Sequence, residues 1–73
     1  MSRLPSLRPA EVVRALERAG FVADRQRGSH LVLSHPNGRF VTVPMHRREM
    51  KRGTLTSIVK DAGLTQEQFL KFL

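Results

Sequence analysis

Three histidines are the side chains of this 73-residue chain that can exchange protons near neutral pH without help from their surroundings. His30 follows a Gly-Ser pair, His35 precedes a proline, and His46 stands in an arginine-rich stretch. If 30–35 is a strand, His30 and His35 face opposite sides of it and lie roughly 16 Å apart, at about 3.3 Å per residue. They can then neither share one metal ion nor act as an acid–base pair. We therefore expect no metal site and no cofactor.

Other familiar catalytic groups are missing or incomplete. The chain has no cysteine, which excludes disulfides, thiolate metal sites and cysteine nucleophiles and fits a reducing compartment. Ser29 adjoins His30, but the Gly-x-Ser-x-Gly turn of serine hydrolases is absent from the sequence, so Ser29 is expected to shape a turn. Gly28 is isolated, and Gly53-Thr54 lacks the spacing and the lysine of a phosphate-binding loop. Serine and nucleotide hydrolases are therefore not indicated.

The net charge points to nucleic acid. Thirteen Lys and Arg against six Asp and Glu give +7, and a basic domain of this kind most often binds a polyanion. RNA carries its own nucleophile, the 2′-OH, so a protein that cleaves it needs only a positioned base or acid and cations for the developing charge. His30 with Arg25, Arg27 and Arg39 around it would suffice for a slow ribonuclease. The same residues would suffice for RNA binding without cleavage, and the charge alone also fits a ribosomal or architectural fragment.

A second group of basic residues lies between positions 45 and 52. This stretch is too charged to be buried and is predicted to be a loop, in which His46 either contacts phosphate or is only solvated. Together the two groups give the expected RNA contacts: Arg25, Arg27, Gly28, Ser29, Arg39, His46, Arg47, Arg48, Lys51 and Arg52.

Hydrophobic spacing and capping residues predict three helices that position these groups. Pro9 opens the first helix, and Gly20 ends it as a left-handed cap. Thr54 is expected to cap the second helix, and Thr65–Gln68 forms a capping box for a short third one. Apolar residues recur at helical spacing in the first two, so each should bury one face.

Three strands are predicted between the first two helices, over 21–27, 30–35 and 39–44. The order α-β-β-β-α with a short C-terminal helix predicts an α+β two-layer sandwich with a three-stranded antiparallel sheet. The double-stranded-RNA-binding domain has this order and layering. We expect a single domain over residues 1–73, with its core from about 9 to 73.

The turn Pro36-Asn37-Gly38 decides which residues share a face of the sheet. A three-residue loop, with a type I turn followed by a left-handed glycine, pairs Leu33 with Val41 and lines one face with aliphatic side chains. A two-residue loop would instead pair Leu33 with Thr42, so we prefer the three-residue loop. Periodicity leaves undecided which face of 21–27 is buried. The opposite face of the hairpin then holds His30, Val32, Ser34, Phe40 and Thr42.

Neither a membrane span nor a signal peptide is expected. No apolar run approaches the roughly 18 residues of a membrane span. The segment Met1–Pro5 has one charge and is not followed by an apolar core region. The missing cysteines agree with this, because they fit a reducing compartment.

Five short motifs, in order and spread over about residues 9–73, resemble those of one family. They are Gly28-Ser29-His30, His35-Pro36-Asn37-Gly38-Arg39, Val43-Pro44-x-His46, Gly53-Thr54-Leu55 and Asp61-Ala62-Gly63-Leu64. The chain resembles the HicA toxins, which are small cytoplasmic mRNA interferases of type II toxin–antitoxin systems, so the resemblance implies a cytoplasmic protein. Each motif is weak alone, but the joint pattern is specific.

The resemblance implies a double-stranded-RNA-binding-like fold, RNA cleavage by a histidine after the Gly-Ser turn, and a HicB antitoxin as partner. The catalytic histidine of the family maps onto His30. Many members carry two or three consecutive histidines there, whereas Leu31 and Val32 follow a single one here. By parity Leu31 faces the core, so only His30 can serve.

An antitoxin is also expected because Val32 and Phe40 would leave apolar surface exposed beside His30 unless a partner covers it.

Two other functions remain as alternatives. One is a non-catalytic RNA-binding module. The other is a DNA-binding helix-turn-helix over 54–73. The composition of its last helix argues against it, because that helix has one lysine and two phenylalanines.

Overall fold

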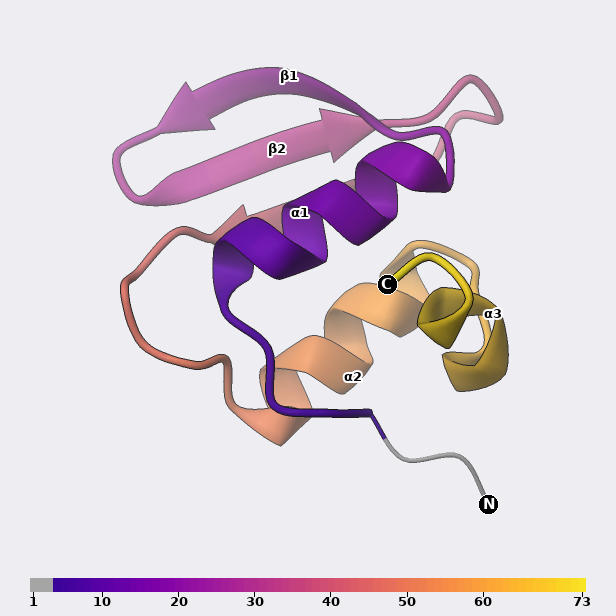
Figure 1. Cartoon of the computed structure of the whole chain (residues 1–73). Helices are drawn as coiled ribbons and strands as arrows, with labels where there is room; N and C mark the ends of the chain where they lie inside the picture. Colours follow the sequence, from indigo (N-terminus) through magenta and orange to yellow (C-terminus); the bar gives the residue numbers. More distant parts are fainter. Residues whose placement is uncertain (1–3) are drawn as a thin grey trace.

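The computed structural model describes residues 4–73 and shows helices packed on one side of a single sheet (Figure 1). The strands form an antiparallel sheet in the order β1-β2-β3. This confirms the predicted α+β fold and its order of elements. In chain order these are α1 (Pro9–Arg18), β1 (Val22–Arg27), β2 (His30–Ser34), β3 (Phe40–Pro44), α2 (Arg52–Asp61) and α3 (Gln66–Leu70).

The extreme N-terminus is outside this description. Residues 1–3 lie outside the described residues, and with them most of the segment in which no signal peptide was expected. Within residues 4–73, no helix is both long enough and apolar enough to cross a membrane.

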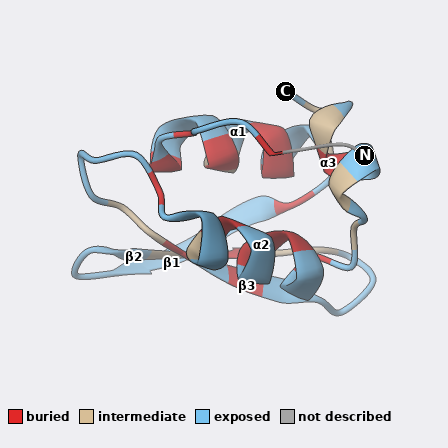
Figure 2. Ribbon diagram, turned by 90° about the horizontal axis from the view of Figure 1, so that it is seen from below, coloured by how far each residue is buried: buried red, intermediate tan, exposed pale blue. Residues whose placement is uncertain are grey.

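The hydrophobic core lies between the sheet and the helices. Leu33 and Val41 of the sheet are fully or almost fully buried, as are Leu16 of α1 and Leu55 of α2. Figure 2 shows the buried residues of both helices turned toward the sheet, while the outer side of the sheet is mostly exposed. One face of the sheet therefore builds the core, and the other is left open.

The capping residues set the ends of α1 as predicted. Pro9 is its first residue. At its end the N–H of Phe21 donates to the Leu16 carbonyl and the N–H of Gly20 donates to the Glu17 carbonyl, both over 3.0 Å. These two bonds form the Schellman motif, in which Gly20 has a φ of 102° that favours glycine.

The start of α2 differs from the prediction. The helix begins at Arg52 with Lys51 as its N-cap, so the prediction that Thr54 caps it was wrong by three positions. The cause lies before the helix: Met50 is buried, and its N–H donates to the Leu7 carbonyl over 2.7 Å. This anchor holds the chain against the N-terminal segment, and arginine and lysine are good helix formers directly after it.

The N-terminal segment contributes to the core as well. Leu4 and Leu7 are both buried, although they precede the start of the core expected near residue 9.

At the other end of the chain, the Thr65 hydroxyl accepts a hydrogen bond from the Gln68 N–H, and the Gln68 side chain accepts one from the Thr65 N–H. The predicted capping box of α3 is thus confirmed.

The hairpin between β2 and β3 has the predicted three-residue loop. The N–H of His35 donates to the Arg39 carbonyl over 2.8 Å, and the N–H of Gly38 donates to the His35 carbonyl over 2.9 Å. Gly38 has a φ of 93°. As a result, Leu33 pairs with Val41 in the register that buries the aliphatic face.

β1 contains a β-bulge that decides the orientation of its side chains. Ala23 lies opposite Leu33 on the core face, but the next pair is Arg25 opposite Val32 on the outer face, so Asp24 is the extra residue. In a regular strand Ala23 and Arg25 would share one face. The sequence periodicity was undecided because the two halves of β1 follow opposite parities.

Candidate functional site

The open face of the sheet is ordered into three rows that run across the strands. The register places residues of β1, β2 and β3 directly opposite one another. Successive rows are two residues apart on β2, which is about 6.7 Å. We call them the apolar row, the middle row and the histidine row. Their members are Val22, Ser34 and Phe40; Arg25, Val32 and Thr42; and Arg27, His30 and Pro44.

The histidine row places an imidazole opposite a guanidinium. Arg27 ends β1 and His30 begins β2, across the Gly28-Ser29 turn, and both side chains are exposed. Side chains at such opposed positions have Cβ atoms about 4.5–5.5 Å apart. The pair can therefore transfer a proton at His30 while Arg27 holds an anion beside it.

A groove of about 590 Å³ extends over this face. It includes three arginines and a single acidic residue, so it attracts anions along its length. We call it the open-face groove. Its lining residues are Asp24, Arg25, Arg27, His30, Val32, Ser34, His35, Gly38, Arg39, Phe40 and Thr42.

Gly28 and Ser29 form the turn that leads into His30. The backbone N–H of Met45 donates to the Ser29 carbonyl, which ties the start of the following loop to this turn. His46 comes next in the chain and is exposed. The predicted contacts Gly28, Ser29 and His46 therefore gather at the same end of the sheet as His30.

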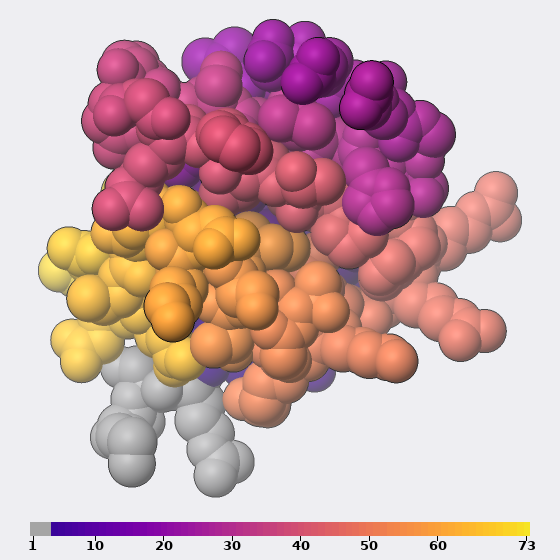
Figure 3. Space-filling model, turned by 180° about the vertical axis from the view of Figure 1, so that it is seen from behind, coloured from indigo at the N-terminus to yellow at the C-terminus, as the bar shows by residue number. Residues whose placement is uncertain are grey.

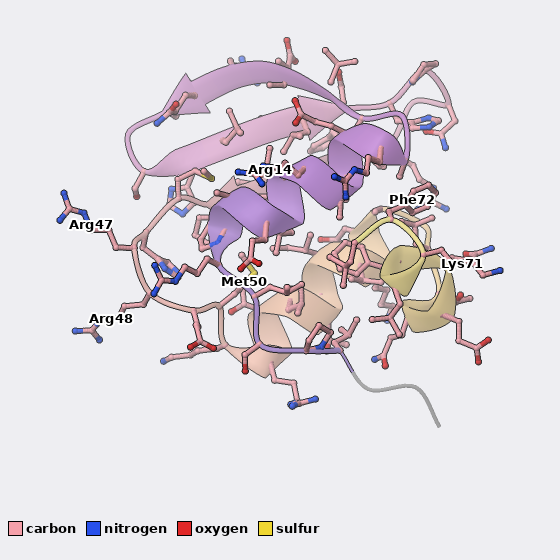
Figure 4. The ribbon with its side chains drawn as sticks, in the orientation of Figure 1. Arg14, Arg47, Arg48, Met50, Lys71 and Phe72 are labelled. Atoms are coloured by element: carbon pink, nitrogen blue, oxygen red, sulfur yellow. The ribbon has the colours of Figure 1, made fainter. Side chains whose placement is uncertain are left out.

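The loop that follows His46 carries a second cationic surface. Figure 3 shows this loop projecting from the side of the molecule, and in Figure 4 Arg47 and Arg48 point away from its body. Lys51 is exposed at the N-terminus of α2. Arg52 differs, because its Nη1 donates to the Leu4 carbonyl over 3.4 Å and so faces the N-terminal segment.

Arg39 does not lie beside His30, where the sequence analysis expected it. It precedes β3 and stands opposite His35, at the far end of the groove from His30. Its Nη1 donates to the Asp61 carbonyl over 3.4 Å, and its guanidinium covers Gly63 so closely that a Cβ there would lie 2.6 Å from Nε. The C-terminal end of α2 thus holds Arg39 in place, with a favourable charge at the helix C-terminus.

His35 has a structural position. Its ring packs against Phe21 with the ring centroids 4.9 Å apart, and its Nδ1 accepts a hydrogen bond from the Asn37 N–H over 3.0 Å. Its Nε2 would lie 2.9 Å from a Cβ added at Gly20. Among residues 4–73, no three His, Asp or Glu side chains gather closely enough to hold a metal ion.

The comparison with known families concerns most of the chain. A family model described as "HicA toxin of bacterial toxin-antitoxin" matches residues 9–64, which is more than half of the chain. The chain belongs to the HicA toxin family. It is therefore a toxin of a bacterial toxin–antitoxin system, with an antitoxin as its general kind of partner. No curated protein matches the chain.

The structure of this HicA-family chain adds residues that sequence reasoning missed. Val22 and Pro44 complete the apolar and histidine rows, and Asp24 is the acidic residue of the groove. Val22 and Asp24 carried no usable signal, because their faces depend on the bulge. Pro44 could have been placed from the hairpin register, which pairs it with His30.

Proposed function

We propose that this toxin is a metal-independent endoribonuclease that cleaves mRNA in the cytoplasm, with His30 as its catalytic residue. One observation carries the proposal: an exposed histidine stands opposite Arg27 on a sheet face that the helices leave uncovered. The cationic groove around His30 supports RNA as the ligand, and membership of the family supports the role as a toxin.

His30 serves a reaction in which RNA provides the nucleophile. The 2′-oxygen bonds to the adjacent phosphorus while the bond from phosphorus to the 5′-oxygen breaks, and the 2′-OH proton is transferred in net to that leaving oxygen. His30 either takes the first proton as a base or gives the second as an acid. The products are a 2′,3′-cyclic phosphate and a free 5′-OH, so no metal-bound water is needed.

The arginines hold the phosphates and stabilise the developing negative charge. Arg27 is nearest to His30 in the register, and Arg25 follows in the middle row. A guanidinium binds phosphate through two parallel hydrogen bonds, which fixes its orientation as well as its position. Arg47, Arg48 and Lys51 would contact the same RNA beyond the end of the sheet.

We further propose that a HicB-type antitoxin inhibits the toxin by covering the open face. Phe40 is 66% exposed and Val32 is half-buried, both on the same face as His30. A partner with acidic and apolar side chains would match this surface. Adding the antitoxin should then abolish RNA cleavage, and an increase in cleavage would contradict inhibition by occlusion.

Replacing the histidine tests the catalytic assignment. His30→Ala should abolish RNA cleavage and growth arrest with an unchanged circular dichroism spectrum, because His30 is exposed. His46→Ala should weaken RNA binding but leave cleavage detectable, and EDTA should have no effect. If folded His30→Ala degraded RNA at the parental rate, the assignment to His30 would be wrong.

A second candidate function is RNA binding without cleavage. It is favoured by the scarcity of proton-transfer groups on the open face, where His30 has no second histidine beside it and Asp24 is the only acid in the groove. Under this alternative the parental protein binds RNA with strong salt dependence but leaves it intact after long incubation.

A further inference from the structure

The apolar row is an unusual feature of a cationic surface. Phe40 is 66% exposed and Val22 is 62% exposed, and they flank Ser34 on the same face. Neither side chain belongs to the buried core, which the sheet builds with its other face. The row therefore contributes little to stability and is available to a ligand.

The position of the row relates it to the histidine row. Along β2, Ser34 lies four residues from His30, which is about 13 Å at 3.3 Å per residue. Arg25 in the middle row stands between the two rows, and Arg39 lies beyond the apolar row at the end of the groove. Arg25 and Arg39 therefore line the same groove as the exposed phenyl ring.

We propose that Phe40 is a nucleobase-stacking site, where one unpaired base of the RNA lies on its ring while the flanking phosphates contact Arg25 and Arg39. This inference rests on the proposed function, because it takes RNA as the ligand of the open face. It adds a second recognition point, about 13 Å from the cleavage point, that selects single-stranded RNA.

The choice of an unpaired base follows from what the ring can reach. In a duplex the faces of the bases are stacked on one another, and proteins read duplex RNA through its backbone and 2′-OH groups. An aromatic ring on an open sheet face can stack only on a base that is free of its neighbours. The Ser34 hydroxyl beside the ring can form a hydrogen bond to the edge of the same base.

The charge distribution favours RNA over a protein at this position. An apolar pair alone would fit either, but the groove has Arg25, Arg27 and Arg39 against Asp24. A polymer that alternates phosphates with aromatic bases matches a groove in which arginines and an exposed aromatic ring occur together. Arg39 uses one donor on Asp61 and retains others of its five N–H groups for a phosphate.

A non-cleavable fluorescent RNA tests the proposal. The probe is a short single-stranded 2′-O-methyl oligonucleotide with one 2-aminopurine, whose emission falls when the base stacks. Its blocked 2′-oxygen prevents cleavage by the parental protein. We expect quenching by the parental protein and by Phe40→Tyr, and loss of quenching with Phe40→Leu. The affinity of Phe40→Leu should fall by roughly five-fold to more than a hundred-fold, the usual contribution of one stacked base.

Leu73→Ala is the matched control. Leu73 is also an exposed apolar residue, at 43%, but it lies beside α1 residues on the helical side of the molecule. This variant should bind and quench like the parental protein. Because Phe40 is exposed, Phe40→Leu should keep its urea midpoint, and the midpoint shows directly whether a loss of binding reflects misfolding.

Four results would overturn the stacking site. One is equal affinity and quenching for Phe40→Leu and the parental protein. Another is equal competition by a 2′-O-methyl duplex and by the single strand. The third is no quenching by the parental protein. The fourth is an effect of Phe40→Leu on antitoxin binding alone, which would make the row a protein-docking surface.

The outcome is separable from that of the catalytic proposal. Cleavage that requires His30 but is indifferent to Phe40 would reject the stacking site and leave the ribonuclease. Quenching that requires Phe40 in a protein that never cleaves RNA would reject the ribonuclease and leave a single-stranded-RNA-binding module.

Discussion

A single methyl group at Gly20 would test how the end of α1 supports the hairpin. Gly20→Ala places a side chain at a φ of 102°, which costs about 1–2 kcal/mol for a residue other than glycine. The new Cβ would also lie 2.9 Å from Nε2 of His35. That ring cannot move freely, because it packs on Phe21 and accepts a hydrogen bond from the Asn37 N–H.

The contacts of His35 give the free-energy cost of moving its ring away from the new Cβ. Displacing the ring gives up a hydrogen bond, worth about 0.5–1.5 kcal/mol, and an aromatic pair, worth about 0.5–1.5 kcal/mol. Gly20→Ala should therefore cost about 2–5 kcal/mol in total. Gly38→Ala is the matched control, because its φ of 93° is similar and its added Cβ meets nothing within 4 Å. It should cost only the backbone part, about 1–2 kcal/mol.

Urea unfolding followed by circular dichroism measures both changes. The urea midpoint should fall further for Gly20→Ala than for Gly38→Ala, with unchanged slopes. The melting temperature of Gly20→Ala should be at least about 4 °C below that of Gly38→Ala. In a His35→Ala background, Gly20→Ala should cost no more than Gly38→Ala. Equal losses for the two glycine variants in the parental background would refute the contact between His35 and the end of α1.

Other substitutions separate stability from binding. Leu33→Ala, in the core, should cost about 2–5 kcal/mol in urea unfolding. Val32→Ala should cost much less because its side chain is only half-buried; similar losses for both would contradict the register of β2. Arg27→Gln should weaken binding of the non-cleavable RNA and reduce the slope of log affinity against log salt by about 0.7, while Arg14→Gln on α1 leaves both unchanged. An unchanged slope for Arg27→Gln would remove this residue from the interface. Thr65→Ala should lower stability by about 1 kcal/mol through loss of the capping box, and a change in RNA affinity would show that α3 takes part in binding.

Features set by neighbouring residues could be predicted from the sequence. The hairpin loop follows from Pro36-Asn37-Gly38, whose dihedral preferences are local, and the register then follows from burying Leu33 opposite Val41. His30 was placed on the open face by the same reasoning. The end of α1 likewise depends on Gly20 alone.

Features set by contacts between residues distant in the sequence could not be predicted from it. At the bulge, Ala23 pairs on the core face and Arg25 pairs on the outer face, with Asp24 between them. Nothing in the local sequence pattern marks this change of parity. The start of α2 depends on the hydrogen bond from Met50 to Leu7, which is 43 residues away in the sequence. Arg39 was expected near His30, but it adjoins the turn between β2 and β3, whereas His30 lies at the other end of β2.

The bulge also bears on how the protein behaves at high concentration. β1 is an edge of the sheet, and regular, uncharged edge strands pair with the edges of other molecules and aggregate. Here Asp24 interrupts the regular edge, and Arg25 and Arg27 add charge to it. The residues that make the face cationic therefore also discourage strand exchange between copies. Removing the bulge and its charges would expose the chain to edge-to-edge aggregation while leaving its core residues unchanged.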